Sequence, residues 1–322
     1  MTALDQPILA DAVEAPPDTP DGLFTRIRRS RRIRFSFAVL MLILLSSLLT
    51  MPLTLRSDHP WGYNNQYALP VRVGPSFSAS ALWCGSDTLG RSLIGRCLLG
   101  GAASLAIGLA AAVISMTLGV AVGLVAGYRG GWIDALLMRI VDILYGLPYL
   151  LLVILFKIAF EKPLSLLVRS ESAANFIVLF IAIGIVSWLT MARVVRGQVL
   201  FLRSLPFIEA CKAAGLGQWR IFTRHLLPNL VGPIVVYATL IVPSAILQES
   251  FLSFLGIGIQ PPLPTWGSLA ADGLSPALNP IVSHWWMLVL PCTLLAVTLL
   301  ALNFLGDGLS DLFDPKAEAA KI

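Results

Sequence analysis

Long apolar stretches separated by shorter polar ones run through most of the 322 residues. A helix needs about 20 apolar residues to cross the hydrocarbon core of a bilayer. Stretches of that length are predicted at about 35–55, within 97–128, and at 133–156, 174–193, 229–249 and 285–305. The pattern therefore predicts an all-α fold, that of a polytopic membrane protein with six transmembrane helices.

The polar segments divide the chain into a tail and one membrane domain. Residues 1–25 are acidic and rich in Pro, which is typical of disorder, and a basic run follows them, so 1–34 is predicted to be a disordered and basic cytoplasmic tail. The outer segments are expected at 56–96, 157–173 and 250–284, and the longest inner segment at 194–228. None of them is long enough for a second folded domain, so 35–317 is predicted to be a single membrane domain.

Composition and charge support a membrane location. Hydrophobic residues make up 57% of the chain and charged residues 13%, against about 25% charged in soluble domains. With the N-terminus placed inside, the inner segments hold about twice as many Lys and Arg residues as the outer ones, as the positive-inside rule requires. We therefore expect a multi-pass protein of the cytoplasmic membrane with both termini in the cytoplasm. The net charge of +5 gathers near helix ends, which favours contact with lipid and not with nucleic acid.

Motifs for catalysis and for cofactors are missing from the sequence. Its four Cys and three His residues form no CxxC or HExxH, so neither a metal site nor a disulfide framework is predicted. No Lys follows a Gly, so the GxxxxGK[ST] phosphate loop is absent, and GxSxG is absent too. We expect a non-catalytic chain without a cofactor of its own.

Two groups of residues within the predicted spans are candidates for structural roles. Gly119, Gly123 and Gly127 recur every four residues, which favours close helix packing within the subunit, with a subunit interface as the alternative. Asp134, Arg139 and Asp142 lie in the third span, where the three-residue spacing of Arg139 and Asp142 predicts a structural ion pair. A proton or ion relay is the alternative.

The outer segment 250–284 is predicted to be partly structured at the membrane surface. It begins with the apolar sequence from Phe251 to Ile257, and Trp266, Trp285 and Trp286 suit the headgroup zone. Its role is either simple anchoring or a lip at the outer mouth that contacts a binding protein.

The inner loop at 203–229 is predicted to form a helix, a turn and a second helix. Pro206 suits the first helical turn, Glu209 complements the helix dipole, and Gly215 ends the helix. A second short helix is expected over 218–225, with Pro228 and Asn229 ending it before the fifth span. Such a rigid knob is suited to binding by a partner protein.

The loop resembles the EAA signature of ABC import permeases. That signature is E-A-A, three residues, G, nine residues, and I-x-L-P, and this chain has Glu209-Ala210-Cys211, Gly215 and His225-Leu226-Leu227-Pro228 at those spacings. Cys211 replaces the second Ala and His225 replaces Ile. The form H-x-L-P-N resembles the variant of peptide permeases.

Further stretches resemble the dipeptide and oligopeptide permease family. They are Gly85-Ser-Asp-Thr-Leu-Gly-Arg-Ser92, Trp188 to Gln198, Glu249 to Gly256, Trp266-Gly267, Asn303 to Leu309 and Asp314-Pro315-Lys316. The resemblance covers about residues 30–317 and is strongest to the C subunits of oligopeptide permeases. It implies the fold of a type I ABC importer permease.

The resemblance also implies partners and a mechanism. This chain would form a heterodimer with a second, homologous permease subunit, two cytoplasmic ATPase subunits would hold ATP and Mg, and an extracytoplasmic peptide-binding protein would deliver cargo. The residues implied in coupling to the ATPase are Phe207, Ile208, Glu209, Ala210, Cys211, Ala214, Gly215, Leu216 and Gly217. Glu209 would form a salt bridge with the ATPase, and cargo would pass along the second, third and fifth spans.

Other functions remain as alternatives. Related permeases of the same importer class carry nickel or peptide-like antibiotics. An ion-driven secondary transporter would show inverted repeats and broken helices around a midplane site, and no such repeat is evident in the sequence. An intramembrane enzyme would need paired acids, a Ser/His pair or metal ligands within the spans.

Overall fold

The computed structural model describes residues 30–313, and the calls for a disordered tail at 1–25 and for the motif at 314–316 lie outside these residues. Its elements are α2 (Arg31–Thr54), η1 (Ser80–Leu82), α3 (Leu93–Arg129), α4 (Gly131–Tyr145), α5 (Tyr149–Val168), α6 (Glu171–Arg203), α7 (Pro206–Ala213), α8 (Gln218–Ile221), η2 (Phe222–Leu226), α9 (Leu227–Phe254), α10 (Trp266–Ala277) and α11 (Trp286–Phe313). Within the described range the only β-type pairing is one isolated bridge between Ser86 and Ser92. The predicted all-α fold is confirmed.

Five apolar helices are each long enough to cross a membrane. They are α2, α3, α6, α11 and the continuous helix Gln218–Phe254, and they correspond to five of the predicted spans. Most extend beyond the predicted bounds. The 37 residues of α3 measure about 55 Å at 1.5 Å per residue, against a hydrocarbon core of about 30 Å, so this helix projects out of the membrane.

The predicted third span, 133–156, is not one straight helix. α4 and α5 meet at a bend of 92°, and only as a bent pair do they provide the sixth span. Pro148 has no N–H and disfavours helical geometry at Leu147, so the helix ends near Gly146 and restarts at Tyr149. α5 then continues to Val168 and covers most of the segment 157–173 that was predicted to be an outer loop.

The centre of the bundle is the packing of α3 on α6. An added Cβ on Gly119 would lie 2.5 Å from the Met191 side chain, and one on Gly127 would lie 2.8 Å from that of Val199. One on Gly123 would lie 2.6 Å from the Ala192 carbonyl oxygen. The three glycines therefore let α6 approach within the same chain, as their spacing favours.

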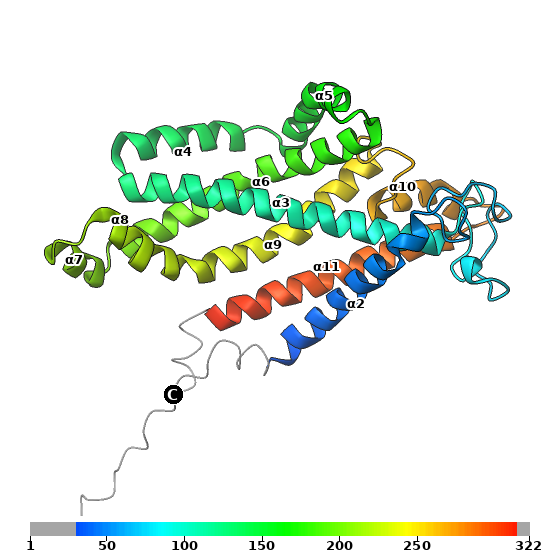
Figure 1. Ribbon diagram of the computed structural model, residues 1–322, viewed down its shortest axis with the longest axis horizontal. Helices are drawn as coiled ribbons and strands as arrows, with labels where there is room; N and C mark the ends of the chain where they lie inside the picture. The colour runs from blue at the N-terminus through cyan, green and yellow to red at the C-terminus, as the bar shows by residue number, and fades with distance from the viewer. Residues whose placement is uncertain (1–29, 314–322) are drawn as a thin grey trace, which may run out of the picture.

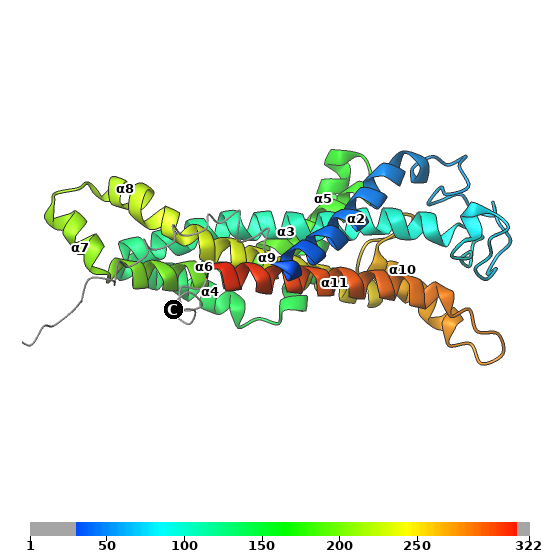
Figure 2. The ribbon, with the colours of Figure 1, turned by 90° about the horizontal axis from the view of Figure 1, so that it is seen from below.

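The helices are arranged along one long axis with different structures at its two ends. α3, α6 and α9 run along this axis, with α2 and α11 on one edge and α4 and α5 on the other (Figure 1). α7 and α8 lie at one end of the molecule, whereas the segment at 55–92 and α10 lie at the opposite end. Figure 2 shows α5 projecting from the bundle beyond the bend.

The predicted end of the second loop helix before the fifth span is wrong. α8 passes through the π-helical turn η2 directly into α9, so Gln218–Phe254 is one helix of 37 residues. Pro228 fits at the start of α9 because the π turn redirects hydrogen bonds, with the Leu227 N–H donating to the Phe222 carbonyl. The Asn229 side chain donates to the His225 carbonyl at 2.6 Å instead of ending the helix.

Candidate functional site

The loop at 203–229 contains a short helix with well-defined ends. α7 begins with Pro206 in its first turn and ends at Ala213. Gly215 has φ +74°, and the N–H groups of Gly215 and Leu216 donate to the carbonyls of Lys212 and Cys211 at 3.0 and 3.1 Å. This pair of bonds is the Schellman motif, which requires a left-handed residue. An added Cβ on Gly215 would meet nothing within 4 Å, so its backbone conformation, and not space, favours glycine there.

The predicted coupling residues divide into anchors and an exposed surface. Ile208 is 1% exposed and packs in a cluster with Val199, Leu202 and Leu226, against which Cys211 and Leu216 also pack. The exposed members are Phe207, Glu209, Ala210, Ala214, Gly215 and Gly217. Cys211 thus occupies a partly buried position suited to a small apolar side chain. We define the six exposed residues as the loop surface.

Residues outside the predicted set fix the loop to the bundle. Arg203 donates to the carbonyls of Gly127 and Tyr128 at 2.7 and 2.9 Å, and the Tyr128 hydroxyl donates to the Gln218 carbonyl at 3.0 Å. The Trp219 ring stacks on Phe222 beside the loop surface and is 76% exposed. Sequence reasoning missed all three contacts, although a Trp within a polar loop is a signal that could have been noted.

Ion pairs join α4 to α6 and differ from the expected pairing. Asp142 pairs with Arg193 at 2.7 Å, and Asp134 pairs with Arg196 through two bonds of 2.5 and 2.6 Å. The expected pair of Arg139 with Asp142 is not formed, and Arg139 is exposed. The arginines of α6 supply partners across the helix interface, which the sequence of α4 alone did not reveal.

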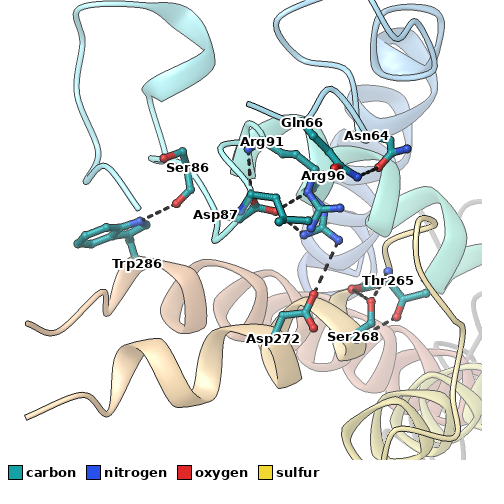
Figure 3. A network of polar contacts seen from close by, with 11 residues as sticks. Asn64, Gln66, Ser86, Asp87, Arg91, Arg96, Thr265, Ser268, Asp272 and Trp286 are labelled. Carbon is teal, nitrogen blue, oxygen red and sulfur yellow. Dashed lines mark hydrogen bonds and ion pairs between the residues drawn. The ribbon is translucent and has the colours of Figure 1, made fainter. Parts of the chain in front are cut away.

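A buried ionic network lies at the end of the molecule opposite α7 (Figure 3). The Asp87 Oδ2 atom accepts from Arg91 Nε and Arg96 Nη1, each at 2.7 Å, and these three side chains are at most 6% exposed. Arg96 Nη2 also lies 3.8 Å from the Asp272 carboxylate of α10. The network joins the outer segment, the start of α3 and α10.

The charges of this network set the pKa of Asp87. Burial by itself raises the pKa, but Arg96, Arg91 and the backbone N–H groups of Leu89 and Arg91 outweigh it and hold the pKa below its ordinary value. Burial raises the pKa of Asp272, which Arg96 and Arg91 only partly offset. Asp87 is therefore the firmly ionised member.

The α10 helix is attached to the bundle by buried polar contacts. Thr265 caps α10 in a capping box, and its hydroxyl donates to the Glu249 carboxylate of α9 at 2.8 Å. The Trp266 indole donates to the Cys97 carbonyl at 3.0 Å. An added Cβ on Gly267 would lie 2.4 Å from the Ser250 Cα, so α10 approaches α9 closely.

The sequence stretches that resembled permeases meet at this outer end. The stretch at 85–92 supplies Asp87 and Arg91, whereas Glu249 and Trp266 come from stretches more than 150 residues away. The predicted structure within 250–284 is present as α10. Its position at a membrane surface and its role remain predictions.

A bundle of apolar spans with a structured, exposed helical loop at one end and a pinned helix at the other defines a multi-pass membrane permease. Residues 119–319 match the family described as the binding-protein-dependent transport system inner membrane component, and the chain belongs to this family. The resemblance inferred from the loop and outer motifs is thereby confirmed.

Characterised relatives are similar over most of the chain. The dipeptide transport system permease protein DppC of Bacillus subtilis is 45% identical over 234 residues, which cover 73% of this chain and 68% of the relative. The oligopeptide transport system permease protein OppC of Haemophilus influenzae is 42% identical over 259 residues, which cover 80% and 76%.

One solved structure supports the fold independently. A chain of the MetNI methionine ABC transporter, in an inward-facing conformation, matches with a TM-score of 0.52 at 18% sequence identity. The match covers 69% of this chain and 98% of that one. The predicted type I importer permease fold is confirmed.

Proposed function

We propose that this chain is one of two homologous permease subunits of an ATP-driven importer that moves peptides across the cytoplasmic membrane. Both termini lie in the cytoplasm, two separate cytoplasmic ATPase subunits bind ATP and Mg, and an extracytoplasmic binding protein delivers the peptide. The chain itself is non-catalytic and holds no cofactor. The proposal is carried by the similarity to permeases named for dipeptide and oligopeptide transport over 73–80% of the chain.

The loop surface supports the position of the ATPase contact. It presents Glu209 and Phe207 on a helix whose inner face is fixed by Ile208 and whose end is fixed by Gly215. Because this helix is held on both sides, a displacement imposed on it is transmitted to α6 and to the helix Gln218–Phe254. In this mechanism the closure of the ATPases tilts the spans, and access alternates between the two sides of the membrane.

Peptide uptake in cells lacking this chain provides the test. Labelled di-, tri- and pentapeptides are supplied to cells with the chain deleted and to cells that carry it on a plasmid. We expect uptake only when the chain is present, and expect it to require the ATPase subunits. Equal uptake in both strains would reject peptide transport.

The same experiment addresses the alternative cargoes of this importer class. Nickel ions and a peptide-like antibiotic are supplied in parallel with the peptides. Uptake of either one that depends on the chain, without uptake of peptides, would assign that cargo instead. The isolated chain should neither bind nor hydrolyse ATP, and stoichiometric ATP binding by it would contradict the division of labour.

A further inference from the structure

A cavity of about 530 Å³ lies where the bend between α4 and α5 meets α6 and α9. Its volume is within the range of about 300–1,000 Å³ that is typical of small-molecule sites. The cavity exists because the helix is broken at 146–148, which moves α5 away from the line of α4. Leu147 at the break is one of its lining residues.

Hydrogen-bonding side chains line this cavity on three elements. They are Tyr149, Ser187, Thr190, Tyr237, Ser244 and Gln248. On α9 the spacing of Tyr237, Ser244 and Gln248 by seven and four residues places them along one face, over about 16 Å at 1.5 Å per residue. The polar groups therefore form a track along the helix and not a single point.

No charged residue is among those that line the cavity. The neighbouring charges neutralise each other, since Arg193 pairs with Asp142 at 2.7 Å and lies 4.0 Å from the centre of the Tyr145 ring at the cavity wall. The lining is consequently suited to a neutral polar group. A charged group would find no counter-ion there and would be costly to desolvate.

Two of the polar groups lack partners. The Tyr149 hydroxyl and Gln248 Oε1 are buried and have no hydrogen-bond partner within the described residues. The Ser187 and Ser244 hydroxyls donate to their own helices, at the carbonyls of Ile183 and Leu240, and keep their acceptor lone pairs. Buried polar groups without partners are destabilising, so a ligand with donors and acceptors at short intervals would stabilise this arrangement.

We propose that this cavity is part of the translocation path and binds the main-chain amide groups of the passing peptide. This inference rests on the proposed function. A peptide main chain offers one N–H donor and one C=O acceptor per residue, and these groups are the same in every sequence. The cavity therefore holds cargo without selecting among side-chain charges, and selection by charge is left to other parts of the assembly.

The first test removes hydrogen-bonding groups at nearly constant volume. The variant Tyr149→Phe/Thr190→Val/Gln248→Met is compared with Leu152→Met, which changes the same cavity without removing a polar group. Uptake by the complete assembly in proteoliposomes is measured at sub-saturating concentrations of trialanine and of tripeptides that contain Lys or Glu. Because each lost hydrogen bond weakens binding modestly, we expect an uptake rate about three- to tenfold lower, by the same factor for all three peptides. Leu152→Met should match the wild type.

The outcomes separate this inference from the proposed function. If the wild-type assembly transports none of the peptides, the proposed function fails and the inference fails with it. If the wild type transports them and the triple variant matches it, only the inference is overturned. A loss confined to the peptide with Lys or to the peptide with Glu would also overturn it, since the cavity would then respond to charge.

Photo-crosslinking provides a second measurement that does not depend on the triple variant. Leu147, which is 43% exposed at the bend, is replaced by p-benzoylphenylalanine, and Leu42 on α2, which is 70% exposed, serves as the control. During turnover with radiolabelled trialanine, we expect label on the chain substituted at 147 and none on the chain substituted at 42. Crosslinks at 147 only to the second permease subunit or to lipid would show that these fill the cavity, and would overturn the proposal.

Discussion

At the scale of single residues, Asp87 is the side chain on which the outer end depends. It is 2% exposed at its side chain and accepts from Arg91 and Arg96 and from two backbone N–H groups at 2.9 Å. Asp87→Asn leaves both arginines buried without a charged partner close by, so we expect a loss of about 3–5 kcal/mol in stability. The purified protein is heated with a thiol-reactive dye, and labelling of buried Cys97 reports opening of this region.

The control for this substitution is Asp58→Asn. Asp58 pairs with Arg56 at 3.5 Å, but its side chain is 75% exposed, and exposed pairs contribute only about 0–1 kcal/mol. The midpoint temperature should therefore fall for Asp87→Asn and stay near the wild-type value for Asp58→Asn. Equal midpoints for the two variants would contradict a stabilising role of the network.

The lowered pKa of Asp87 predicts acid sensitivity at the same place. A carboxylate whose pKa is lower in the folded than in the unfolded state stabilises the fold above its unfolded pKa of about 3.9, and this contribution is lost as pH falls further. We expect dye labelling of Cys97 to rise as pH falls below about 4, and expect Asp87→Asn to lack this transition. A pH profile identical in the two proteins would assign the acid effect to other groups.

The sequence alone located Asp87 only through its resemblance to a family motif. It did not identify Asp272 as part of the network, because that residue is 185 positions away and nothing local marks the contact. The same reason explains the incorrect partner of Asp142. An i,i+3 neighbour is visible in sequence, whereas Arg193 is brought close only by the packing of α6 on α4.

At the scale of elements, the contact between α3 and α6 is the most constrained. Gly123→Leu would place a large side chain against the α6 backbone and Val195, so we expect a loss of more than about 3 kcal/mol or failure to accumulate. Gly197→Ala on α6 is the control, because an added Cβ there meets nothing within 4 Å and alanine favours the helix. Expression level and midpoint temperature check both, and a stable Gly123→Leu protein would contradict the packing.

The α7 element carries the prediction for coupling. Glu209→Lys reverses an exposed charge, so the fold should change by less than about 0.5 kcal/mol. An ATPase contact would be weakened by a stranded like charge, so less ATPase should co-purify and peptide uptake should fall. Asp311→Lys, an exposed charge reversal on α11, is the control. Normal uptake and co-purification with Glu209→Lys would make the loop only a connector.

Element prediction succeeded where a single physical signal dominated. The length of an apolar run is enough to identify a span, and five spans were found in this way. The bend at Pro148 was missed because its neighbours are as apolar as a span requires. The continuation of α8 into α9 was missed because a π turn, which relocates hydrogen bonds, has no clear pattern of residue types.

At the scale of the whole molecule, the orientation in the membrane is the next quantity to measure. Ser57 and Ser204 are exposed and lie at opposite ends of the long axis. After replacement of the four native cysteines, a single Cys is introduced at either position in intact cells. A membrane-impermeant thiol reagent should label position 57 and leave position 204 unlabelled until the membrane is opened. The reverse pattern would invert the topology.

The unbroken helix Gln218–Phe254 acts as a lever across the membrane. Its 37 residues span about 55 Å, begin beside the loop surface, pass the cavity and end near the Glu249 contact that holds α10. Rotation by about 10° about its midpoint would move each end about 5 Å, in opposite directions. A push at the ATPase end is therefore delivered at the outer mouth with its sign reversed, so one rigid body closes one side as it opens the other.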